Sequence, residues 1–310
     1  MGQSDRKIIL VTRRTRLQEL VARYNTVEQA KFQAEHLGMD FSDFLQEDAR
    51  YQSAIVQVEE SLKAHGRVQR LDRGFLPNFL FPPQCLVVVL GQDGLVANTL
   101  KYLDGQQVMA INPDPARWDG VLLPFVVADV PVAIVEILRG QRKTRQVTMG
   151  RARLSDGQEL LAVNDFFVGA RSHVSARYEI SLGDLSERQS SSGVIVSTGL
   201  GSTGWLRSVL TGATAIAGKS SSRIKALREH GMDWAVEEMV FTVREPYPSR
   251  SSQASLVFGQ CSTDAPLRIR SLMPEGGVIF SDGIEADGLD FRSGLEAVID
   301  VSPKHGLLLA

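Results

Sequence analysis

The feature that most constrains the fold is an uninterrupted apolar run from Cys85 to Leu90, with Pro82-Pro83 before it and Gly91 after it. Continuous β-branched runs of this kind are typical of strands that are buried on both faces of a parallel sheet. Shorter runs at Ile8 to Val11 and at Val108 to Ile111 fit the same description. The sequence therefore predicts a parallel sheet built from the first third of the chain.

Helical patterns separate these strands. Good helix formers occupy about Thr26 to Leu37, and Gly38 follows as a plausible C-cap. Asp48 to His65 has apolar residues at spacings of three and four, and Leu95 to Leu103 is also expected to be helical. The alternation of strand and helix predicts an open α/β layer over about the first 120 residues.

The pattern changes after Pro124. Short strand-like runs with turn signals between them dominate from there on, at 126–128, 132–138, 147–154, 160–163 and 178–182. Beyond Val194 only about Trp205 to Leu210 and Ser222 to His230 are expected to be helical. We therefore predict an α/β domain over residues 1–124 and a β-rich domain over residues 125–303.

The composition excludes several classes of function. With 34 basic and 36 acidic residues, the formal net charge is −2, which argues against a protein that wraps nucleic acid non-specifically. Two cysteines are too few for a disulfide framework, and the five histidines show no metal-ligand spacing. The apolar runs are far shorter than the roughly 20 residues of a membrane-spanning helix. We expect a cytoplasmic protein without a targeting segment, a nucleic-acid partner or a membrane partner.

The turn after the central strand reads Gly91-Gln92-Asp93-Gly94 and leads into a predicted helix. Ligands of open α/β sheets bind outside the carboxyl ends of the strands. Glycines let a backbone approach a phosphate, and a helix N-terminus offers N–H groups to an anion. An aspartate in such a turn would hold a divalent metal or accept a proton from a hydroxyl nucleophile. A purely structural turn with the aspartate as N-cap explains the residues equally well.

Two further motifs lie in the second half. Asn164-Asp165 stands between apolar runs, where an amide and a carboxylate need partners because unpaired buried polar groups cost roughly 1–3 kcal/mol. A nucleoside would supply such partners, although a turn between two strands is the simpler explanation. The segment 199–204 matches GxGxxG between a strand and a helix, but no acidic residue follows about 20 positions later. We interpret it as a turn of N–H groups and hydroxyls near a nucleotide.

Taken in order, these motifs resemble those of the NAD kinase family, within the diacylglycerol-kinase and phosphofructokinase-like group. That family has a GGDG turn, an Asn-Glu pair, and a strand that leads into a Thr-Gly-Ser-Thr-Ala-Tyr-like turn. The mitochondrial-type branch is the most similar, over roughly residues 7 to 290. Its further similarities are Thr12-Arg13-Arg14-Thr15-Arg16, Ile111-Asn112-Pro113-Asp114-Pro115, Tyr178-Glu179-Ile180-Ser181, Ser191-Ser192-Gly193 and Val243-Arg244-Glu245-Pro246.

The resemblance implies an N-terminal open α/β (Rossmann-like) domain and a C-terminal β-rich domain of the NAD kinase type, with the site in the cleft between them. Residues 304–310 could then return to the first domain. The implied reaction is phosphoryl transfer from ATP or polyphosphate to the 2′-hydroxyl of the adenosine ribose of NAD, which yields NADP. Mg²⁺ would be held through the phosphates, with Asp93 as an optional ligand. Because the family is generally oligomeric, we expect a homodimer.

The resemblance also assigns roles to individual residues. Asp93 matches the catalytic aspartate, which orients and deprotonates the hydroxyl. The phosphate of the donor would contact Gly91, Gln92, Gly94 and Leu95. The NAD-binding positions are Asn164, Asp165, Ser192, Thr203, Gly204, Trp205 and Ser208.

Four positions depart from the family pattern. Gln92 replaces the second glycine of GGDG, and Leu95 replaces the hydroxyl residue that usually follows, so both changes fall on the donor side. Asp165 replaces glutamate and Gly204 replaces alanine. Glutamine would strain the turn if position 92 needed a positive φ. The alternatives are therefore a catalytically weak or inactive protein that binds NAD or another nucleotide, or a kinase of another hydroxyl acceptor such as a lipid or sugar.

Overall fold

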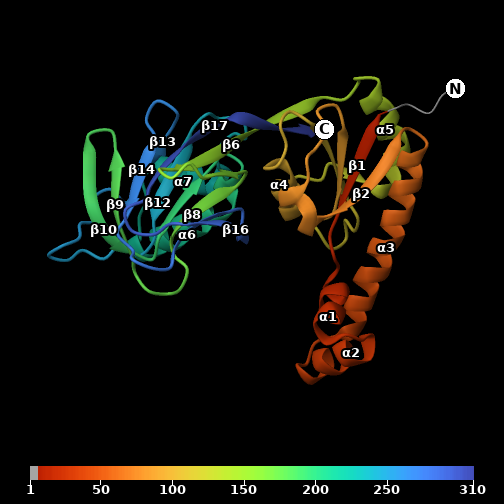
Figure 1. The fold of residues 1–310 in the computed structure, drawn as a ribbon, viewed down its shortest axis with the longest axis horizontal. Helices are drawn as coiled ribbons and strands as arrows, with labels where there is room; N and C mark the ends of the chain where they lie inside the picture. Colours follow the sequence, from red (N-terminus) through yellow and green to blue (C-terminus); the bar gives the residue numbers. More distant parts are fainter. Residues whose placement is uncertain (1–5) are drawn as a thin grey trace. The chain divides into compact units, whose positions relative to one another are not determined.

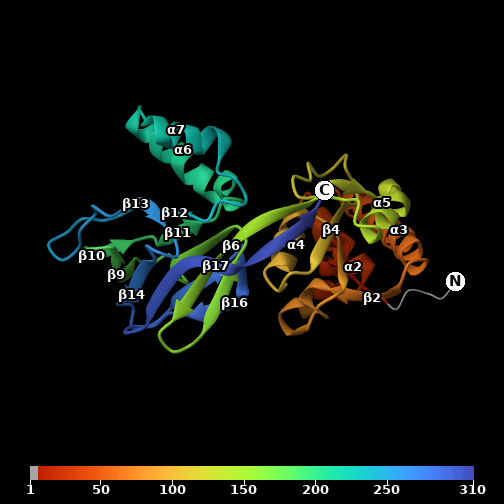
Figure 2. The same cartoon turned by 90° about the horizontal axis from the view of Figure 1, so that it is seen from above.

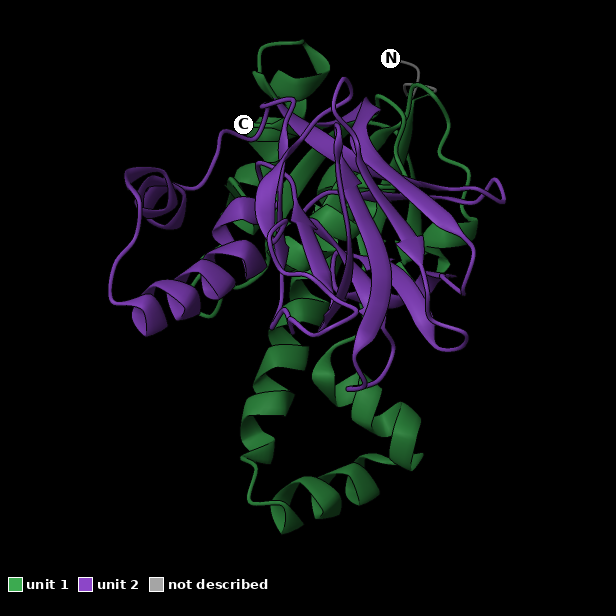
Figure 3. Ribbon diagram, turned by 90° about the vertical axis from the view of Figure 1, so that its left-hand side faces the viewer, with its two compact units in different colours: residues 1–145, 307–310 green, residues 146–306 purple. Residues whose placement is uncertain are grey.

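The structure is a computed structural model that describes residues 6–310. The chain forms two compact units: residues up to 145 with 307–310 make unit 1, and residues 146–306 make unit 2 (Figure 3). The sequence predicted a boundary after residue 124. The structure divides later because β5 (Phe125–Val126) pairs with the edge of the unit 1 sheet and the helix after it packs on the same unit.

Unit 1 is built on a parallel sheet in the order β2-β1-β3-β4. Its strands are β1 (Lys7–Thr12), β2 (Arg67–Asp72), β3 (Leu86–Leu90) and β4 (Gln107–Asn112). Every residue of β3 is buried, as its composition predicted. After β1, the chain forms β2 on one side of β1 and then crosses over to form β3 on the opposite side of β1. The direction in which strands are added to the sheet therefore reverses between β1 and β3. Such switch points open a crevice at the carboxyl ends of the strands.

The helices of unit 1 depend on local capping signals. They are α1 (Arg16–Tyr24), α2 (Val27–His36), α3 (Phe41–Lys63), α4 (Asp93–Leu100) and α5 (Val130–Leu138), with 3₁₀ turns at Arg73–Asn78 and Val127–Asp129. The sequence interpretation missed α1, although Thr15 and Gln18 form a capping box at its start. α3 begins at Phe41 because Asp40 caps it, earlier than predicted. α1 and α2 pack together beside the N-terminal part of α3 (Figure 1).

The prediction of a strand over residues 132–138 was wrong, because this segment is α5. Its β-branched composition favoured a strand. The buried positions, however, are Val130, Ala133, Ile134 and Ile137, which share one helical face, and Pro131 lies in the first turn, where proline is tolerated. Packing of that face against α3 and the sheet outweighs the local β propensity.

Unit 2 is β-rich, as predicted, with two sheets. The first runs β10-β9-β14-β17 with β6 and β7 alongside, and the second runs β13-β12-β11-β8-β15-β16. The core lies where the two sheets face each other, with Phe166 and Phe241 from the second sheet and Tyr178 and Ile269 from the first. The strand bounds are β6 (Thr144–Leu154), β7 (Glu159–Ala162), β8 (Asp165–Ala170), β9 (Ala176–Leu182), β10 (Leu185–Ser191), β11 (Val194–Ser197), β12 (Met239–Val243), β13 (Phe258–Cys261), β14 (Leu267–Ser271), β15 (Gly277–Ser281), β16 (Ile284–Asp290) and β17 (Glu296–Leu309).

The last residues of β17 return to unit 1, where Leu307 and Leu308 pair in parallel with the start of β4. In unit 2, a 3₁₀ turn at Gly201–Thr203 leads into α6 (Trp205–Ala217), which runs well beyond the predicted end. α7 (Ser222–His230) matches its prediction, and the two helices lie side by side (Figure 2), packed through Leu206 and Leu227. Within residues 6–310, no helix combines the length and apolar character needed to cross a membrane.

Candidate functional site

The junction of β3 and α4 differs in detail from the expected turn. α4 begins at Asp93, so Asp93 and Gly94 form its first turn, and Gln92 is the N-cap residue without a side-chain capping bond. Gln92 has φ −107° and ψ 166°, an extended conformation that any residue adopts. Glutamine is therefore accommodated without backbone strain at the position where the NAD kinase pattern has glycine.

The two glycines of this junction serve different purposes. A Cβ on Gly91 would lie 2.7 Å from a methyl group of Leu95, so glycine lets the helix start close to the strand end. A Cβ on Gly94 would meet nothing within 4 Å, and Gly94 is exposed. The first N–H groups of a helix have no intrahelical acceptor, so those of Asp93 and Gly94 are suited to an anion. Leu95 is only 2 % exposed and contributes no hydroxyl.

A hydrogen bond from the loop after β4 holds the half-buried Asp93. The Leu122 N–H donates to Asp93 Oδ1 over 2.6 Å. Asn112 at the end of β4 shapes that loop: its side-chain amide donates to the Trp118 carbonyl over 2.9 Å and accepts from the Asp114 N–H over 3.0 Å. Sequence reasoning noted Asn112 only as part of a motif. The bond to Leu122 leaves Asp93 Oδ2 to accept from another donor.

Tyr51 of α3 spans the switch point between β1 and β3. Its hydroxyl donates to the Leu90 carbonyl over 2.7 Å and accepts from the Arg13 N–H over 3.0 Å, immediately before the Gly91 junction. Burial raises the pKa of Tyr51 to about 12, so the phenol stays protonated and keeps both bonds. Tyr51 thereby fixes the two strand ends that carry the candidate donor site.

An ion-pair network braces the same end of unit 1. Asp43 of α3 accepts from Arg117 in the loop after β4 and from Arg16 of α1. These bonds, led by that from Arg117, hold the pKa of Asp43 well below its usual range. Arg13 pairs with the buried Glu47 over 2.9 Å. The loop that positions Asp93 is thus tied to two helices.

No group of three or more His, Cys, Asp or Glu side chains that could hold a metal ion occurs in the part of the chain that the structure describes. A lone carboxylate such as Asp93 fits a Mg²⁺ ion that keeps waters and substrate phosphates as its main ligands. The residues are therefore compatible with a phosphate-bound metal but do not form a protein cage.

In unit 2, Asn164 and Asp165 lie at the start of β8 in a corner fixed from two sides. The Asp282 carboxylate, in the turn between β15 and β16, accepts from the N–H groups of Val163 and Asn164 at 2.6–3.1 Å, and from that of Asp165 at 3.3 Å. On the other side, Thr198 Oγ1 donates to the Val163 carbonyl over 2.6 Å. Asp282 is 118 residues from Asn164 in sequence, and no local signal pointed to it.

The Asp165 carboxyl is buried and has a raised pKa. It is 7 % exposed, and burial together with the nearby Asp282 carboxylate raises its pKa to about 7. Hydrogen bonds from hydroxyl donors would favour the ionised carboxylate, whereas burial favours the protonated acid. Such pKa values are enriched at functional sites, although structural pairs also produce them.

The GxGxxG segment packs directly against this corner. A Cβ on Gly201 would lie 1.9 Å from the Asn164 carbonyl oxygen, and one on Gly199 would lie 2.0 Å from the Asp233 carbonyl oxygen. Ser202 Oγ accepts from the Met232 N–H over 2.8 Å. These glycines therefore permit close approach of the protein's own backbone. The N–H groups of Gly201 and Gly204 donate to Thr198 Oγ1 and to the Gly201 carbonyl, so these N–H groups are bound within the protein, unlike the sequence expectation of a turn that offers them to a nucleotide.

A pocket of about 860 Å³ lies wholly within unit 2, on the side of the second sheet that faces away from the core. Phe167 and Phe280, cross-strand neighbours on β8 and β15, stack with ring centres 4.9 Å apart, and Trp205 stacks on Phe167 at 5.8 Å. Of the predicted NAD-binding residues, Ser192 and Trp205 line this pocket. Sequence reasoning did not identify Phe167 and Phe280 as pocket residues.

The remaining predicted residues lie close by in the chain. Thr203 and Gly204 connect the Gly201 turn to Trp205, and Ser208 Oγ contacts the Gly204 carbonyl at 3.4 Å one turn into α6. The predicted NAD-binding residues therefore all belong to unit 2. Asp93 and the candidate donor residues 91–95 belong to unit 1.

No family model and no curated protein sequence matches the chain. Solved structures do match it. An NAD kinase from Archaeoglobus fulgidus in complex with ATP has a TM-score of 0.59, at 15 % identity over 98 % of this chain and 93 % of that chain. The chain adopts the NAD kinase fold. Yeast NADH kinase complexed with NADH gives a TM-score of 0.58 at 15 % identity, over 99 % of this chain and 84 % of that chain.

Proposed function

We propose that the protein is an NAD kinase-like phosphotransferase that transfers a phosphoryl group to the 2′-hydroxyl of the adenosine ribose of NAD and yields NADP. The observation that carries the proposal is Asp93 at the start of α4, held by Leu122 with its second oxygen left to accept. Likeness in fold to an NAD kinase and an NADH kinase supports the choice of acceptor. The motif resemblance points to the same acceptor.

In the proposed mechanism, Asp93 Oδ2 accepts the proton of the ribose hydroxyl. The hydroxyl oxygen then forms a bond to the terminal phosphorus of ATP or polyphosphate. The bond from that phosphorus to its bridging oxygen breaks, and ADP or the shortened polyphosphate leaves. A well-placed general base contributes roughly 10²–10⁴-fold to the rate. Mg²⁺, bound through the donor phosphates, would neutralise charge that develops in the transition state.

Unit 2 would supply recognition of NAD. Asn164 presents an amide for a base edge, and Asp165 presents a carboxylate for ribose hydroxyls. Trp205 lines the pocket, where Phe167 stacks on its ring and the Arg244 guanidinium lies over it. This division assigns donor chemistry to residues 91–95 and acceptor recognition to the residues around β8 and α6.

The test is an NADP-formation assay on the purified chain with NAD, Mg²⁺ and either ATP or polyphosphate. The proposal predicts NADP, detected with an NADP-specific dehydrogenase, in a one-to-one ratio with the ADP released from ATP. Because transfer to another hydroxyl of NAD would not support that dehydrogenase, its signal reports the 2′ position. The absence of NADP with both donors would contradict the proposal.

A second candidate is an NAD-binding protein without turnover. The burial of Leu95 favours it, because that position lacks the hydroxyl of the family pattern on the donor side. This candidate predicts saturable NAD binding by calorimetry together with no NADP from either donor. The same two measurements therefore separate the candidates.

A further inference from the structure

The pocket of unit 2 joins an aromatic row to a guanidinium group. Phe280, Phe167 and Trp205 stack in sequence, with planes inclined by 28° and 14°. The Arg244 guanidinium lies over the Trp205 ring, 5.6 Å from its centre, and Arg244 also lines the pocket. An aromatic surface that ends at a cation is suited to a ligand that carries a ring beside an anionic group.

The backbone fixes Arg244 at this place. The Arg244 N–H donates to the Gly193 carbonyl over 2.8 Å, and the Arg244 carbonyl accepts from the Ser192 N–H over 2.9 Å. These bonds extend the pairing of β11 with β12 beyond Val243. The next residue, Glu245, has φ +42°, a conformation that non-glycine residues rarely adopt and that clusters at ligand sites. The two backbone bonds therefore fix the main chain of Arg244, directly before the unusual conformation of Glu245.

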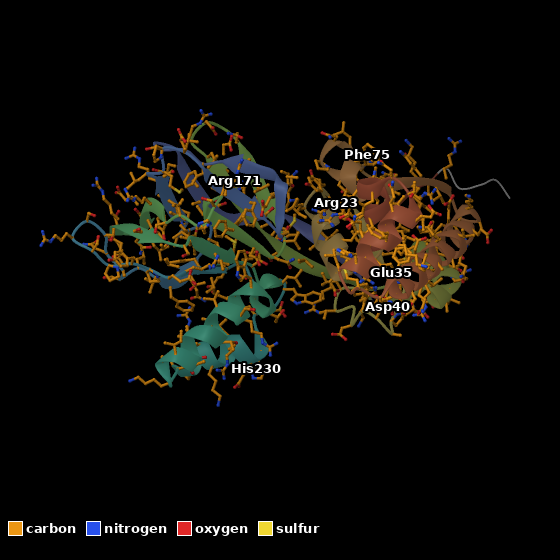
Figure 4. The ribbon with its side chains drawn as sticks, turned by 90° about the horizontal axis from the view of Figure 1, so that it is seen from below. Arg23, Glu35, Asp40, Phe75, Arg171 and His230 are labelled. Atoms are coloured by element: carbon orange, nitrogen blue, oxygen red, sulfur yellow. The ribbon has the colours of Figure 1, made fainter. Side chains whose placement is uncertain are left out.

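Arg244 is weakly paired for a pocket residue. The Glu245 carboxylate approaches it to only 3.7 Å, and that side chain is 66 % exposed, so solvent screens the pair. Arg171, also in the pocket lining and visible in the loop after β8 (Figure 4), instead makes a 3.0 Å ion pair with Asp290. Both pairs are screened by solvent, since Arg171 and Asp290 are 61 % and 71 % exposed, so either guanidinium group can bind an incoming anion.

Ser192 adds a second donor beside Arg244. It is exposed, it lines the pocket, and its backbone is tied to Arg244 by the bond described above. A guanidinium and a hydroxyl together can donate several hydrogen bonds to phosphate oxygens, with the planar guanidinium able to bind two of them at once. Lysine in place of Arg244 would supply the charge without this paired geometry.

We infer that Arg244, with the Ser192 hydroxyl, recognises the diphosphate of the dinucleotide acceptor at the Trp205 end of the pocket. The inference rests on the proposed function for the identity of the acceptor. It makes Arg244 a binding residue that distinguishes phosphate-bearing ligands from nucleosides.

The experiment is calorimetry on the full chain with NAD, with adenosine, which lacks phosphate, and with a non-hydrolysable ATP analogue plus Mg²⁺. For Arg244→Gln we expect NAD affinity to fall about 10- to 100-fold, as for the loss of hydrogen bonds to a charged group. Adenosine and the ATP analogue should change less than about twofold. Arg244→Lys should recover part of the NAD affinity.

Arg268→Gln is the matched control. Arg268 is a half-exposed arginine on β14 of unit 2, and it forms an ion pair with Glu296 on β17. It should leave all three affinities unchanged. Unchanged adenosine binding also shows that Arg244→Gln keeps the pocket folded, and Arg244→Lys retains the cation over Trp205. The inference is overturned if Arg244→Gln weakens NAD and adenosine equally, leaves NAD unaffected, or weakens only the ATP analogue.

Failure of the inference and failure of the proposed function give different results. If the wild type forms NADP and Arg244→Gln binds NAD normally, only the inference fails. If NAD affinity depends on Arg244 as described but the wild type forms no NADP, only the proposed function fails.

Discussion

Two glycine-bearing turns, each following a buried strand and leading into a helix, use glycine for opposite reasons. At Gly94 in unit 1, the space where a Cβ would stand is empty, and the first turn of α4 is open. At Gly201 in unit 2, that space holds the Asn164 carbonyl oxygen. The first turn therefore leaves space in which a ligand could bind, whereas the space at the second turn is occupied by the protein's own backbone.

The difference shows that a glycine pattern does not identify a phosphate site. The second turn matches the better-known pattern, yet its glycines at 199 and 201 bring backbones together to support the Asn164 corner. The first turn departs from its family pattern at Gln92, yet its backbone is relaxed and its helix start is accessible. We therefore propose that the first turn carries the donor chemistry and that the second supports NAD recognition.

The largest effect on folding is expected for Gly201→Ala. The new methyl would lie 1.9 Å from the Asn164 carbonyl oxygen, and backbone cannot move aside as a flexible side chain can. Overpacking of this kind costs about 3 kcal/mol, which thermal or denaturant unfolding would measure. The matched variant Gly94→Ala should stay within about 0.5 kcal/mol of the wild type. Equal stability of the two variants would contradict the claim that close packing requires glycine at 201 but not at 94.

Asp282→Asn tests the support of the corner from its other side. An asparagine there can accept fewer of the backbone N–H groups of residues 163–165, and an unsatisfied buried donor costs about 1–3 kcal/mol. Asparagine tolerates the φ of +55° at this position, so the variant isolates the hydrogen bonds from backbone strain. The exposed Asp264→Asn serves as the control in unfolding measurements. If both variants unfold at the same temperature, the hydrogen bonds of Asp282 do not stabilise the backbone at residues 163–165.

Asp165 should make stability depend on pH. Its pKa in the folded protein, about 7, is raised above its ordinary value of 3.8, so the folded state binds a proton that the unfolded state has lost. The stabilisation from this proton is complete below pH 3.8 and is lost as the pH rises through 7. Asp165→Asn lacks the titration, so its stability should match that of the wild type near pH 4 and exceed it at pH 8. A difference between the two proteins that is constant with pH would refute this assignment.

Gln92→Gly should have the smallest effect. Because Gln92 already has an extended backbone, glycine would relieve no strain, and we expect NADP formation to change less than about threefold. Gly94→Val, which would fill the open space, should instead raise the KM for the donor. A large gain of activity in Gln92→Gly would show that the glutamine side chain obstructs the first turn.

Local sequence was sufficient for β1, β3, β4 and α7, because burial patterns and caps lie within those segments. It missed the parallel strand β2, of which only Leu71 is buried. It failed at α5, where β-branched residues such as Val130 and Ile134 form a helix because the sheet and α3 accept that helical face. It also missed α1, whose start depends on a reciprocal bond between Thr15 and Gln18.

The site was harder to predict than the fold. Asp93, Asn164 and Asp165 were recognisable because their residue types stand next to turns in an apolar setting. The residues that hold them were not: Leu122 contributes only a backbone N–H, and Asp282 reaches the corner from 118 residues away. Tertiary contacts of this kind leave no periodicity in the sequence.

The most direct test of the account compares NADP formation by the wild type and by Asp93→Asn, with NAD affinity measured on both proteins by calorimetry. Asparagine keeps the bond from Leu122 but cannot accept the hydroxyl proton as a base. The account predicts NADP formation by the wild type, a turnover about 10²–10⁴-fold lower in the variant, and equal NAD affinity in the two proteins. Equal turnover in the two proteins, or no NADP from the wild type, would contradict the account.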